Sequence, residues 1–484
     1  MRAVSLALLA LLAPATAQAP GASILLTNNG IQAAAQFVAP LLQAELLALT
    51  LPDEKFNEVV VDIHLTGLRV SRVAVGAAAS AAAGGALAVS LDLSGLHLAA
   101  QYQAWVVGIP AGSGPCDVEV DAAAALTVEV GADCSSGPLA CKPRLAAQGV
   151  QVSVASISPV CKGVAGQVLD ALVDVFKGAV KQSLTAAAEA AITSLIDTAA
   201  NAALQGASLD VPLLGGAVLA RFDLTAAAPP SGARGAFLSL PLLGDAVLAA
   251  NASTRAPFPL PALPPGPFAG CATSALQLAL SDFSLESLTW ALWGMGALQS
   301  LLPHTVLPPA FPIQLNTTDV AALAPGLSKA FPGEWMQLAL ALSAPPTANI
   351  SAQGGLALAA PLSIAFQALP PSGPPVTAFT LGCPLALALT LGVRGAGQQQ
   401  QNLTANVTSA ACQLAVSSSS VGPVDAGGLA LLVDFVLDLV LLPLANAVLN
   451  VGLPLPSLEG LQLTGSTIFY APGFAGVCTN FTTA

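Results

Sequence analysis

Residues 209–219, LDVPLLGGAVL, return near the end of the chain as LPLPSLEGLQL at residues 453–463. The two copies share the pattern Leu-x-apolar-Pro-x-Leu-x-Gly-x-x-Leu, and each follows a long apolar stretch with helical spacing, 163–205 and 429–450. A partial third match at 238–243 has no such stretch before it. Because a helix-then-strand unit lies near the end of each half, the sequence predicts two similar modules.

The composition limits the class of protein. At 484 residues the chain has room for two or three domains. It is 55% hydrophobic and 8% charged, against about 25% charged in an average soluble domain, so much apolar surface must be buried or must contact something apolar. The net charge of −12 gives a field that repels nucleic acid and anionic lipid.

The first residues have the pattern of a secretory signal peptide, residues 1–17. Arg2 is followed by an apolar run at 4–12 and by the small-x-small site at 15–17, so we expect cleavage after Ala17 and secretion. Six N-x-S/T sequons agree with a secreted glycoprotein and predict surface loops at Asn251, Asn316, Asn349, Asn402, Asn406 and Asn480.

Secretion permits disulfides, and the eight cysteines contain no C-x-x-C pair, which disfavours a zinc or thioredoxin-like site. Cys383 and Cys412 flank two apolar runs, 385–393 and 403–407, on either side of a Gly- and Gln-rich turn. Equal arms about a turn place both cysteines opposite each other on an antiparallel hairpin, which predicts a disulfide. The weaker candidate pairs are Cys141–Cys161, Cys116–Cys134 and Cys271–Cys478.

Hydrophobic spacing predicts a helix, a sheet and a second helix in the first half. Residues 29–49 have an amphipathic helical pattern that ends at Leu51-Pro52-Asp53. Residues 163–205 form the longest helical pattern, with an apolar stripe opposite Asp and Lys side chains. Between them, alternating runs predict a strongly twisted antiparallel sheet with strands at 59–65, 68–75, 87–98, 118–130 and 150–157.

A Pro-rich connector, RAPFPLPALPPGPF at 255–268, excludes a helix or a central strand there. Beyond it the sequence predicts strands, then the disulfide hairpin, then a long helix at 427–450. The predicted strands of this half include 276–283, 288–293, 336–342 and 356–366. The chain is therefore expected to comprise a signal peptide (1–17), a first module (18–250), a linker (251–270) and a second module (271–484).

The apolar run at 429–449 is long enough to span a membrane, because about 20 apolar residues suffice. However, Asp434 and Asp438 share one face, and Pro443 interrupts the run. Each central Asp costs roughly 2.5–3.5 kcal/mol on insertion scales. The run is therefore predicted to be an amphipathic helix with a strongly apolar inner face.

Four stretches resemble one family, that of bactericidal permeability-increasing protein, lipopolysaccharide-binding protein and the plasma lipid transfer proteins. They are NNGIQAAAQFVAPLLQAELLALTLPD at 28–53, the connector followed by ALQLALSDFSLESLTWALWGMGALQ at 275–299, the strand pair at 336–366, and the helix and strand at 421–463. The resemblance implies an α+β fold of two similar modules, each a strongly twisted antiparallel β-barrel with long amphipathic helices. A central antiparallel sheet joins them into a boomerang.

The resemblance also implies an apolar pocket in each module for the acyl chains of a phospholipid or other acyl lipid. The chains are expected to lie against the inner faces of the long helices. The expected lining residues are Ile31, Ala35, Val38, Val164, Val168, Leu172 and Val175 in the first module and Leu432, Phe435, Val436 and Leu439 in the second.

Two features depart from the family. The family's N-terminal disulfide joins a strand to the interior of the next helix, whereas Cys161 precedes 163–205 and no cysteine lies within that stretch. Endotoxin-binding relatives carry basic residues at the tip of the first barrel, whereas no Lys or Arg occurs between Arg72 and Lys142. The sequence therefore favours a neutral or zwitterionic lipid held by burial, each enclosed CH₂ contributing about 0.8 kcal/mol.

The sequons bear on where the protein meets a lipid surface. Asn402 and Asn406 lie beside the turn of the predicted hairpin, and glycans there would keep that end of the second module in water. A transient membrane contact is therefore expected at the end of the first module.

No catalytic, metal or cofactor site can be assembled from the sequence. The histidines His64, His97 and His304 lack metal-ligand spacing, and no nucleophile elbow, P-loop or dinucleotide fingerprint occurs. We expect a secreted lipid-binding or lipid-transfer protein and not an enzyme. One alternative is a host-defence protein that binds bacterial lipopolysaccharide or another microbial envelope lipid; another is an elongated extracellular glycoprotein without lipid. The sequence leaves the oligomeric state open.

Overall fold

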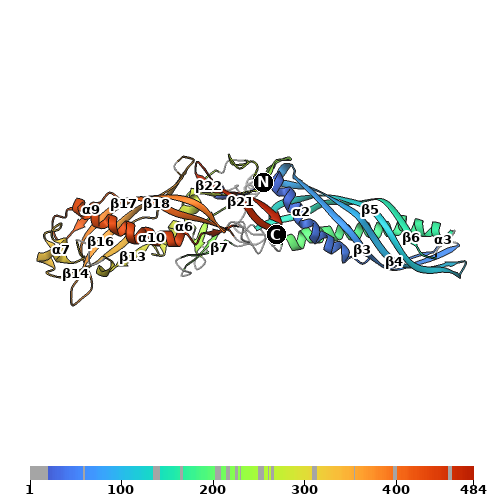
Figure 1. Ribbon diagram of the computed structural model, residues 1–484, viewed down its shortest axis with the longest axis horizontal. Helices are drawn as coiled ribbons and strands as arrows, with labels where there is room; N and C mark the ends of the chain where they lie inside the picture. Colours follow the sequence, from blue (N-terminus) through green and yellow to red (C-terminus); the bar gives the residue numbers. More distant parts are fainter. Residues whose placement is uncertain are drawn as a thin grey trace, which may run out of the picture.

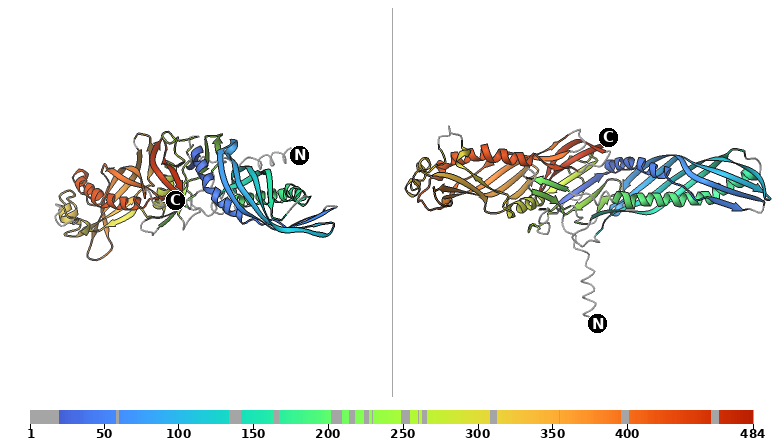
Figure 2. Two further views of the ribbon diagram at one scale, coloured as in Figure 1. Left: turned by 45° about the vertical axis from the view of Figure 1, so that its right-hand side comes forward. Right: turned by 90° about the horizontal axis from the view of Figure 1, so that it is seen from below.

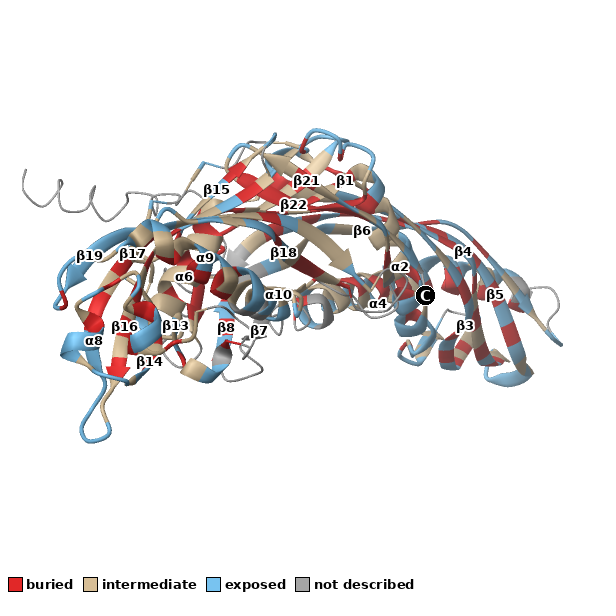
Figure 3. Cartoon of the chain, turned by 60° about the vertical axis from the view of Figure 1, so that its left-hand side comes forward, coloured by how far each residue is buried: buried red, intermediate tan, exposed pale blue. Residues whose placement is uncertain are grey.

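The computed structural model shows an elongated, bent molecule with a curled sheet in each half (Figure 1, Figure 3). It describes residues 20–57, 60–133, 142–163, 167–201, 209–213, 218–223, 227–228, 230–248, 255–259, 261–262, 266–307, 313–353, 355–395, 401–455 and 461–483. The expected boundaries of the signal peptide and the cleavage site therefore lie outside the described residues. The division into two modules and a linker stays a prediction.

A central antiparallel sheet joins the two halves. In the described part of the chain its strands run in the order β21-β22-β12-β1-β10-β9. Strand β1 of the first half lies between β10 and β12, and its Ala22 is opposite Leu242 on one side and Leu280 on the other. The bounds are β1 Ala22–Thr27, β9 Ser231–Ala233, β10 Phe237–Leu242, β12 Leu276–Ser281, β21 Leu461–Ala471 and β22 Phe474–Thr483. Strands from both halves thus share one hydrogen-bonded sheet, as expected for the boomerang fold.

The first module is a sheet of long strands in chain order. These are β2 Glu54–Asn57, β3 Val61–Ala81, β4 Ala86–Val106, β5 Ile109–Asp133 and β6 Lys142–Cys161. Buried and exposed residues alternate along them (Figure 3). The sequence predicted shorter strands because β-bulges reset the alternation: the register shifts between Thr66 and Arg69 beside Gly67, and between Leu93 and Leu96 beside Gly95. The runs predicted at 59–65 and 68–75 therefore form one bent strand.

Two helical segments cover the open sides of this sheet. Helix α2, Asn28–Leu47, begins where the Thr27 hydroxyl accepts a hydrogen bond from Gly30 N–H, and it packs along β3. The second segment combines α3 Gln167–Val175, a π-helical turn Phe176–Val180, α4 Lys181–Ser194 and a π-helical turn Leu195–Ala200, and it packs along β6. Figure 2 shows both running along the module. The two predicted helices of the first half are confirmed.

An asparagine ties each long helix to the edge of its sheet. Asn201 Oδ1 accepts from the Leu145 N–H at 2.7 Å, and its Nδ2 donates to the Leu145 carbonyl at 2.7 Å. Asn446 makes the same reciprocal pair with Val407 of the second module, at 2.7 and 3.3 Å. Each amide therefore acts as one more residue of a neighbouring strand and satisfies a backbone edge that would otherwise be unpaired. Both asparagines lie in an Ala-Asn-Ala-x-Leu segment shortly before a copy of the repeat.

The second module repeats the plan with shorter strands. Its sheet runs β13-β14-β16-β17-β18-β20 among the residues that the structure describes, with β15 on β16 and β19 on β17. The bounds are β13 Gln299–Leu302, β14 Trp335–Leu342, β15 Thr347–Ser351, β16 Gly355–Leu369, β17 Val376–Arg394, β18 Asn402–Ala411, β19 Ala415–Ser419 and β20 Leu453–Pro454. The long helix combines α9 Ala426–Val436, a π-helical turn Leu437–Leu441 and α10 Leu442–Leu449, as the sequence predicted. Short helices α7 Thr317–Val320 and α8 Leu327–Ala330 lie at the outer end.

Helix α6, Asp282–Gly294, corrects one prediction, because the sequence reading placed a strand at 288–293. The Ser281 hydroxyl accepts a hydrogen bond from Ser284 N–H and caps the first turn, where Asp282 supplies a favourable negative charge. The Leu and Trp residues that suggested strand alternation pack at helical spacing instead. The predicted strand at 276–283 likewise ends at Ser281, where the helix begins.

The strands that open the two copies of the repeat, β7 (Leu209–Leu213) and β20, contact each other. Strand β7 pairs with β8, Val218–Phe222, and β8 pairs with β11, Ala246–Leu248. The repeat therefore marks equivalent points of the two modules that meet beside the central sheet.

Three disulfides lie in the described part of the chain. Cys383–Cys412 braces the hairpin of β17 and β18 with a Cα separation of 5.4 Å, which confirms that prediction, and Cys271–Cys478 is also confirmed. Cys161 pairs with Cys116, because β5 and β6 align in register there, so the predicted pairs Cys141–Cys161 and Cys116–Cys134 are wrong. Cys134 and Cys141 lie outside the described residues.

The sequons lie on regular structure more often than the sequence suggested. Asn349, Asn402, Asn406 and Asn480 lie on strands, and Asn316 caps α7 by accepting from the Thr318 and Asp319 N–H groups. Asn349, Asn406 and Asn480 are exposed, Asn316 and Asn402 are half-buried, and Asn251 is outside the described residues. Their expected position in loops is therefore wrong for the four on strands, while their glycosylation stays a prediction. Within the described ranges, no helix is both long and apolar enough to cross a membrane.

Candidate functional site

An apolar cavity of about 150 Å³ lies at the inner end of the second module, beside the central sheet. Helix α6 forms one wall, strands β16, β17 and β18 form another, and the end of α10 with β20 closes the space between them. Cavities of this size lined by Leu, Ile and Phe stay dry and take up apolar guests. The lining residues are Phe222, Leu280, Leu285, Leu288, Thr289, Ile350, Leu356, Leu358, Leu389, Leu391, Leu403, Thr404, Ala405, Leu449, Gly452, Leu453 and Ala475.

The cavity wall offers almost no free polar group to a guest. Of its two threonines, Thr289 donates to the carbonyls of Glu286 and Pro346, and Thr404 donates to the Gly392 carbonyl at 3.2 Å. Several lining leucines, among them Leu358 and Leu391, are only half-buried, so their side chains retain surface that a guest can cover. Such a wall recognises hydrocarbon and discriminates little between polar headgroups.

Gly452 lets the chain after α10 close the cavity. Its φ is +74°, and a Cβ there would lie 2.7 Å from the Leu403 carbonyl oxygen. Only glycine combines this left-handed conformation with so close an approach to β18. The next residue, Leu453, then pairs with Leu403 and presents its side chain to the cavity.

The pocket residues that the sequence predicted in the second module lie mainly in a neighbouring core. Leu432 and Val436 are buried, and Phe435 packs partly against the same cluster, which includes the stacked rings of Phe366 and Phe379. Leu439 is 59% exposed. The cavity is instead lined by Leu449, at the far end of the same helical segment, by α6 and by the strands. Sequence reasoning missed α6 because it read those residues as a strand.

In the first module the predicted residues divide among core, edge and surface. Val168, Leu172 and Val175 are buried in one large cluster with β3–β6. Ile31 is buried in a second cluster, against which Ala35 packs. Val38 is 40% exposed, and Val164 is outside the described residues.

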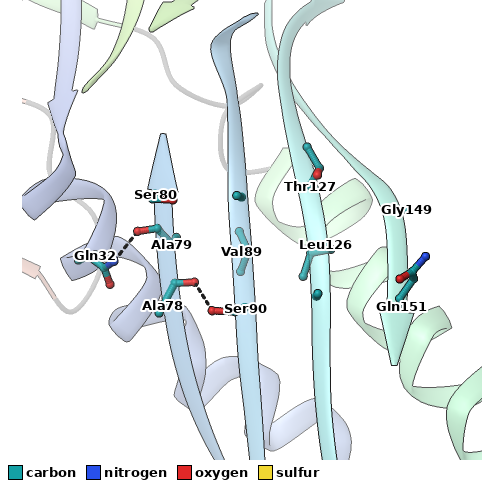
Figure 4. Close-up of a pocket in the computed structure, with 12 residues that line it drawn as sticks. Gln32, Ala78, Ala79, Ser80, Val89, Ser90, Leu126, Thr127, Gly149 and Gln151 are labelled. Carbon is teal, nitrogen blue, oxygen red and sulfur yellow. Dashed lines mark hydrogen bonds between the residues drawn. The ribbon is translucent and has the colours of Figure 1, made fainter. Parts of the chain in front are cut away.

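A larger hollow of about 510 Å³ lies in the first module, between the start of α2 and strands β3–β6 (Figure 4). It exists because small side chains occupy adjacent positions on the strands, and its lining mixes polar and apolar groups. Gln32 donates to the Ala79 carbonyl at 2.6 Å, and Ser90 donates to the Ala78 carbonyl at 3.4 Å. Ala78, Ser90 and Thr127 are exposed, so this hollow is open to water and is less suited to hydrocarbon than the cavity of the second module.

A partly buried charged cluster, in which Asp245 is the buried member, lies behind the cavity wall. Arg255 of the linker contacts Asp223 at 2.6 Å and Asp245 at 3.3 Å, next to Phe222 and Ala246 of strands β8 and β11. Burial raises the pKa of the Asp245 carboxyl to about 6; the Arg255 charge opposes this shift, and the Asp223 charge adds to it. Burial also raises the pKa of Glu286 in α6, although that carboxylate accepts a hydrogen bond from the Ala348 N–H. The cavity therefore lies beside one carboxyl, that of Asp245, that changes protonation in mildly acidic solution.

Strands β4 and β5 of the first module carry no Lys or Arg. Arg72 of β3 contacts His97, and His97 in turn contacts the Asp117 carboxylate at 3.2 Å. The positive charge of Arg72 is therefore partly neutralised. No group of His, Cys, Asp and Glu residues suited to a metal ion occurs in the residues that can be described.

Comparisons with known proteins agree with this architecture. Residues 243–481 match a family model described as the LBP / BPI / CETP family, C-terminal domain. The chain is 26% identical over 193 residues to a bactericidal permeability-increasing protein of Sebastes schlegelii, a match that covers 40% of each chain. It is 27% identical over 190 residues to a lipopolysaccharide-binding protein of Bos taurus, covering 39% of this chain and 38% of the relative. These matches thus span well under half of either curated relative.

Among solved structures, the crystal structure of a lipopolysaccharide-binding protein aligns over 96% of this chain and 99% of its own length. The TM-score is 0.60 at 19% sequence identity, so this match concerns the fold. The expected two-module α+β architecture with a shared central sheet is therefore confirmed over nearly the whole chain.

Proposed function

Because this chain belongs to the LBP / BPI / CETP family, we propose that it is a secreted protein that binds lipid and transfers it between surfaces, with acyl chains buried in its apolar interior. The observation that carries the proposal is the leucine-rich cavity between α6, α10 and the second sheet. Each CH₂ enclosed there would contribute about 0.8 kcal/mol, so a few enclosed carbons outweigh the loss of a weak polar contact.

The chemistry of the wall points to a lipid selected by its hydrocarbon. The chain carries a net charge of −12, which disfavours anionic headgroups over neutral or zwitterionic ones. We expect a phospholipid such as phosphatidylcholine, or another acyl lipid of low net charge. We further expect no catalytic turnover of this ligand, since the cavity wall is almost wholly hydrocarbon.

The support for one pocket per module differs between the two modules. The leucine-rich cavity supports a pocket in the second module. For the first module the proposal rests on family membership and on the inward stripe of α3, because the larger hollow there has a mixed lining. Contact between lipid and the eleven residues predicted from the sequence stays a prediction.

A cavity-filling variant tests the function. Leu358→Trp adds bulk to a half-buried lining residue, and Leu301→Trp makes the same change at an exposed position of β13 in the same module. We expect organic extracts of the purified wild-type protein, analysed by mass spectrometry, to contain acyl lipid. Leu358→Trp should retain much less lipid and bind fluorescent phosphatidylcholine at least tenfold more weakly, whereas Leu301→Trp should match the wild type. Circular dichroism and thermal melting should show that both variants are folded; wild-type protein without lipid would refute the function.

Binding of microbial lipopolysaccharide is the second candidate, because both curated relatives carry that function or a bactericidal one in their names. The gap in basic residues between Arg72 and Lys142 predicts that charge does not drive such binding. Capture of lipopolysaccharide in 0.5 M salt, in competition with phosphatidylcholine, would favour this candidate. Weak capture that disappears with salt would count against it.

A further inference from the structure

Phe222 differs from the other residues that line the apolar cavity of the second module. Among the described residues of the lining, it is the one aromatic side chain and the one that precedes the Pro-rich connector in the sequence. It lies on β8, the middle strand of the small sheet β11-β8-β7, and it is 3% exposed. At this point the cavity of the second module is therefore closed by a strand from the first half of the chain.

Helix α6 connects the two ends of the cavity. Leu285 packs against a cluster that includes Ile350 and Leu356 of the second sheet. One helical turn later, Leu288 packs against Phe222. Both leucines line the cavity. The hydrocarbon surface therefore runs along α6 from the sheet residues at one end to the Phe222 ring at the other.

The backbone at Phe222 is fixed on both sides. Strand β8 pairs with β7 along one edge and with β11 along the other. At the next residue, the Asp223 N–H donates to the Asp245 carbonyl at 2.8 Å, and the Asp223 carboxylate contacts Arg255 at 2.6 Å. Because the strand is paired on both edges and tied at its end, Phe222 cannot retreat from a guest as a loop residue could.

The region beyond the Phe222 ring does not suit hydrocarbon. Asp223 follows Phe222 directly, and Arg255 joins Asp223 to Asp245, which is 2% exposed. An apolar chain pushed toward these groups would remove water from charges that are already partly desolvated, and this is unfavourable. The end of the cavity at Phe222 is therefore both a steric and a chemical limit.

We propose that Phe222 sets the length of the acyl chain that the cavity of the second module accepts. A bound chain would lie along Leu285 and Leu288, with its terminal methyl group against the Phe222 ring. The inference rests on the proposed function, because it concerns the same cavity, and it assigns selectivity for chain length to one side chain from the first half of the chain. Each CH₂ enclosed before the ring should raise the affinity about fourfold, the equivalent of about 0.8 kcal/mol, and further CH₂ groups should add nothing.

Two substitutions of Phe222 in the full-length protein should change the preferred chain length in opposite directions. Phe222→Leu shortens the side chain at the end of the cavity, so the preferred acyl chain should be about two or three carbons longer. Phe222→Trp adds bulk there, so the preferred chain should be shorter by a similar amount. The matched control is Phe379→Leu in the neighbouring core, where Phe379 is 1% exposed and stacks on Phe366, outside the cavity lining.

The measurement is competition between fluorescent phosphatidylcholine and lysophosphatidylcholines whose single acyl chains have 12 to 20 carbons, each used below its micelle concentration. Dividing the affinity of each variant by that of the wild type for the same lipid cancels the differences in solubility along the series. From the shortest to the longest chain, this ratio should rise at least tenfold for Phe222→Leu and fall at least tenfold for Phe222→Trp. It should stay constant for Phe379→Leu.

A constant ratio for Phe222→Leu, in a variant whose circular dichroism shows that it is folded, overturns the proposal. The same rise in Phe379→Leu also overturns it. The wild type gives a test that needs no variant: affinity that keeps rising by the same factor up to the longest chain shows that no residue limits the length. Any of these results with lipid bound refutes the role of Phe222 alone, whereas a wild type that binds neither lysophosphatidylcholine nor phosphatidylcholine refutes the function and this proposal with it.

Discussion

In the first module the inner face of the long helix, from Val168 to Val175, packs into one continuous core with strands β3–β6. In the second module the corresponding helix packs into a core at Leu432 and Val436 but ends beside a hollow at Leu449. The same edge device, an asparagine paired with a strand, fastens both helices. The comparison teaches that an apolar helix stripe sets which side faces inward, whereas a cavity depends on how the helix ends and neighbouring elements meet.

The largest expected effect compares a packed leucine with a lining leucine. Leu172→Ala should lower the free energy of unfolding by about 3–4 kcal/mol, because this fully buried side chain leaves a void in a tight core. Leu358→Ala should cost less than about 1.5 kcal/mol, because its half-buried side chain already faces a cavity. Guanidinium unfolding followed by circular dichroism measures both. Equal losses would mean that the two interiors are equally well packed.

A pH experiment tests the charged group beside the cavity of the second module, the Asp245 carboxyl. The pKa of Asp245 is about 6 in the folded protein, against about 3.9 in an unfolded chain, so the folded state binds the proton more tightly. The contribution of this group to stability is therefore greatest below pH 4 and declines as the pH rises through 6. Asp245→Asn should stabilise the protein by about 2 kcal/mol at pH 7.5 and by much less at pH 4.5.

The control for Asp245→Asn is Asp319→Asn, which alters a carboxylate exposed on α7. Thermal melts of both variants and the wild type should be recorded at pH 4.5, 6 and 7.5. A stability difference that is the same at all three pH values would contradict the assignment to Asp245.

The two asparagines that pair with strand edges, Asn201 and Asn446, give a smaller expected effect on stability. Only the loss of Asn446 should also affect bound lipid. Asn201→Ala and Asn446→Ala each leave a strand N–H and C=O without the amide partner, which costs about 1–2 kcal/mol. Asn446 lies one helical turn before the cavity residue Leu449, so its loss should also speed release of bound lipid. Stopped-flow measurement of fluorescent phosphatidylcholine release should show faster loss from Asn446→Ala and an unchanged rate from Asn201→Ala. Equal release rates for the two variants would show that the pairing of Asn446 with Val407 does not influence the cavity.

The smallest expected effect concerns the two outer ends. The first module ends in the strained turn at Val107, whereas the β16–β17 loop of the second module is the Pro-rich PPSGPP at 370–375. Val107→Asn should raise the free energy of unfolding by about 1 kcal/mol, since Asn tolerates positive φ. Denaturant titration checks this gain. A loss of stability would show that the Val107 side chain makes a stabilising contact.

Sequence periodicity predicted the long helices well, because a stripe over many turns is a redundant signal. It divided β3 in two, because the bulge at Gly67 reverses the alternation for one residue. It read part of α6 as a strand, since a short apolar run fits both periods. Cys383 and Cys412 could be paired because they are symmetric about a turn; Cys116 and Cys161 could not, because their approach depends on the register of two long strands.

The sequence by itself determined the two-module plan, most of the inward faces of the helices and the scarcity of charge, because repeats, apolar periodicity and composition are local properties of the chain. Only the tertiary structure decided which leucines line a cavity, which cysteines meet across strands and that Val107 protrudes from a strained turn. Those features depend on the distances between segments remote in sequence and on the backbone angles that strand pairing imposes. No local pattern of residues specifies them.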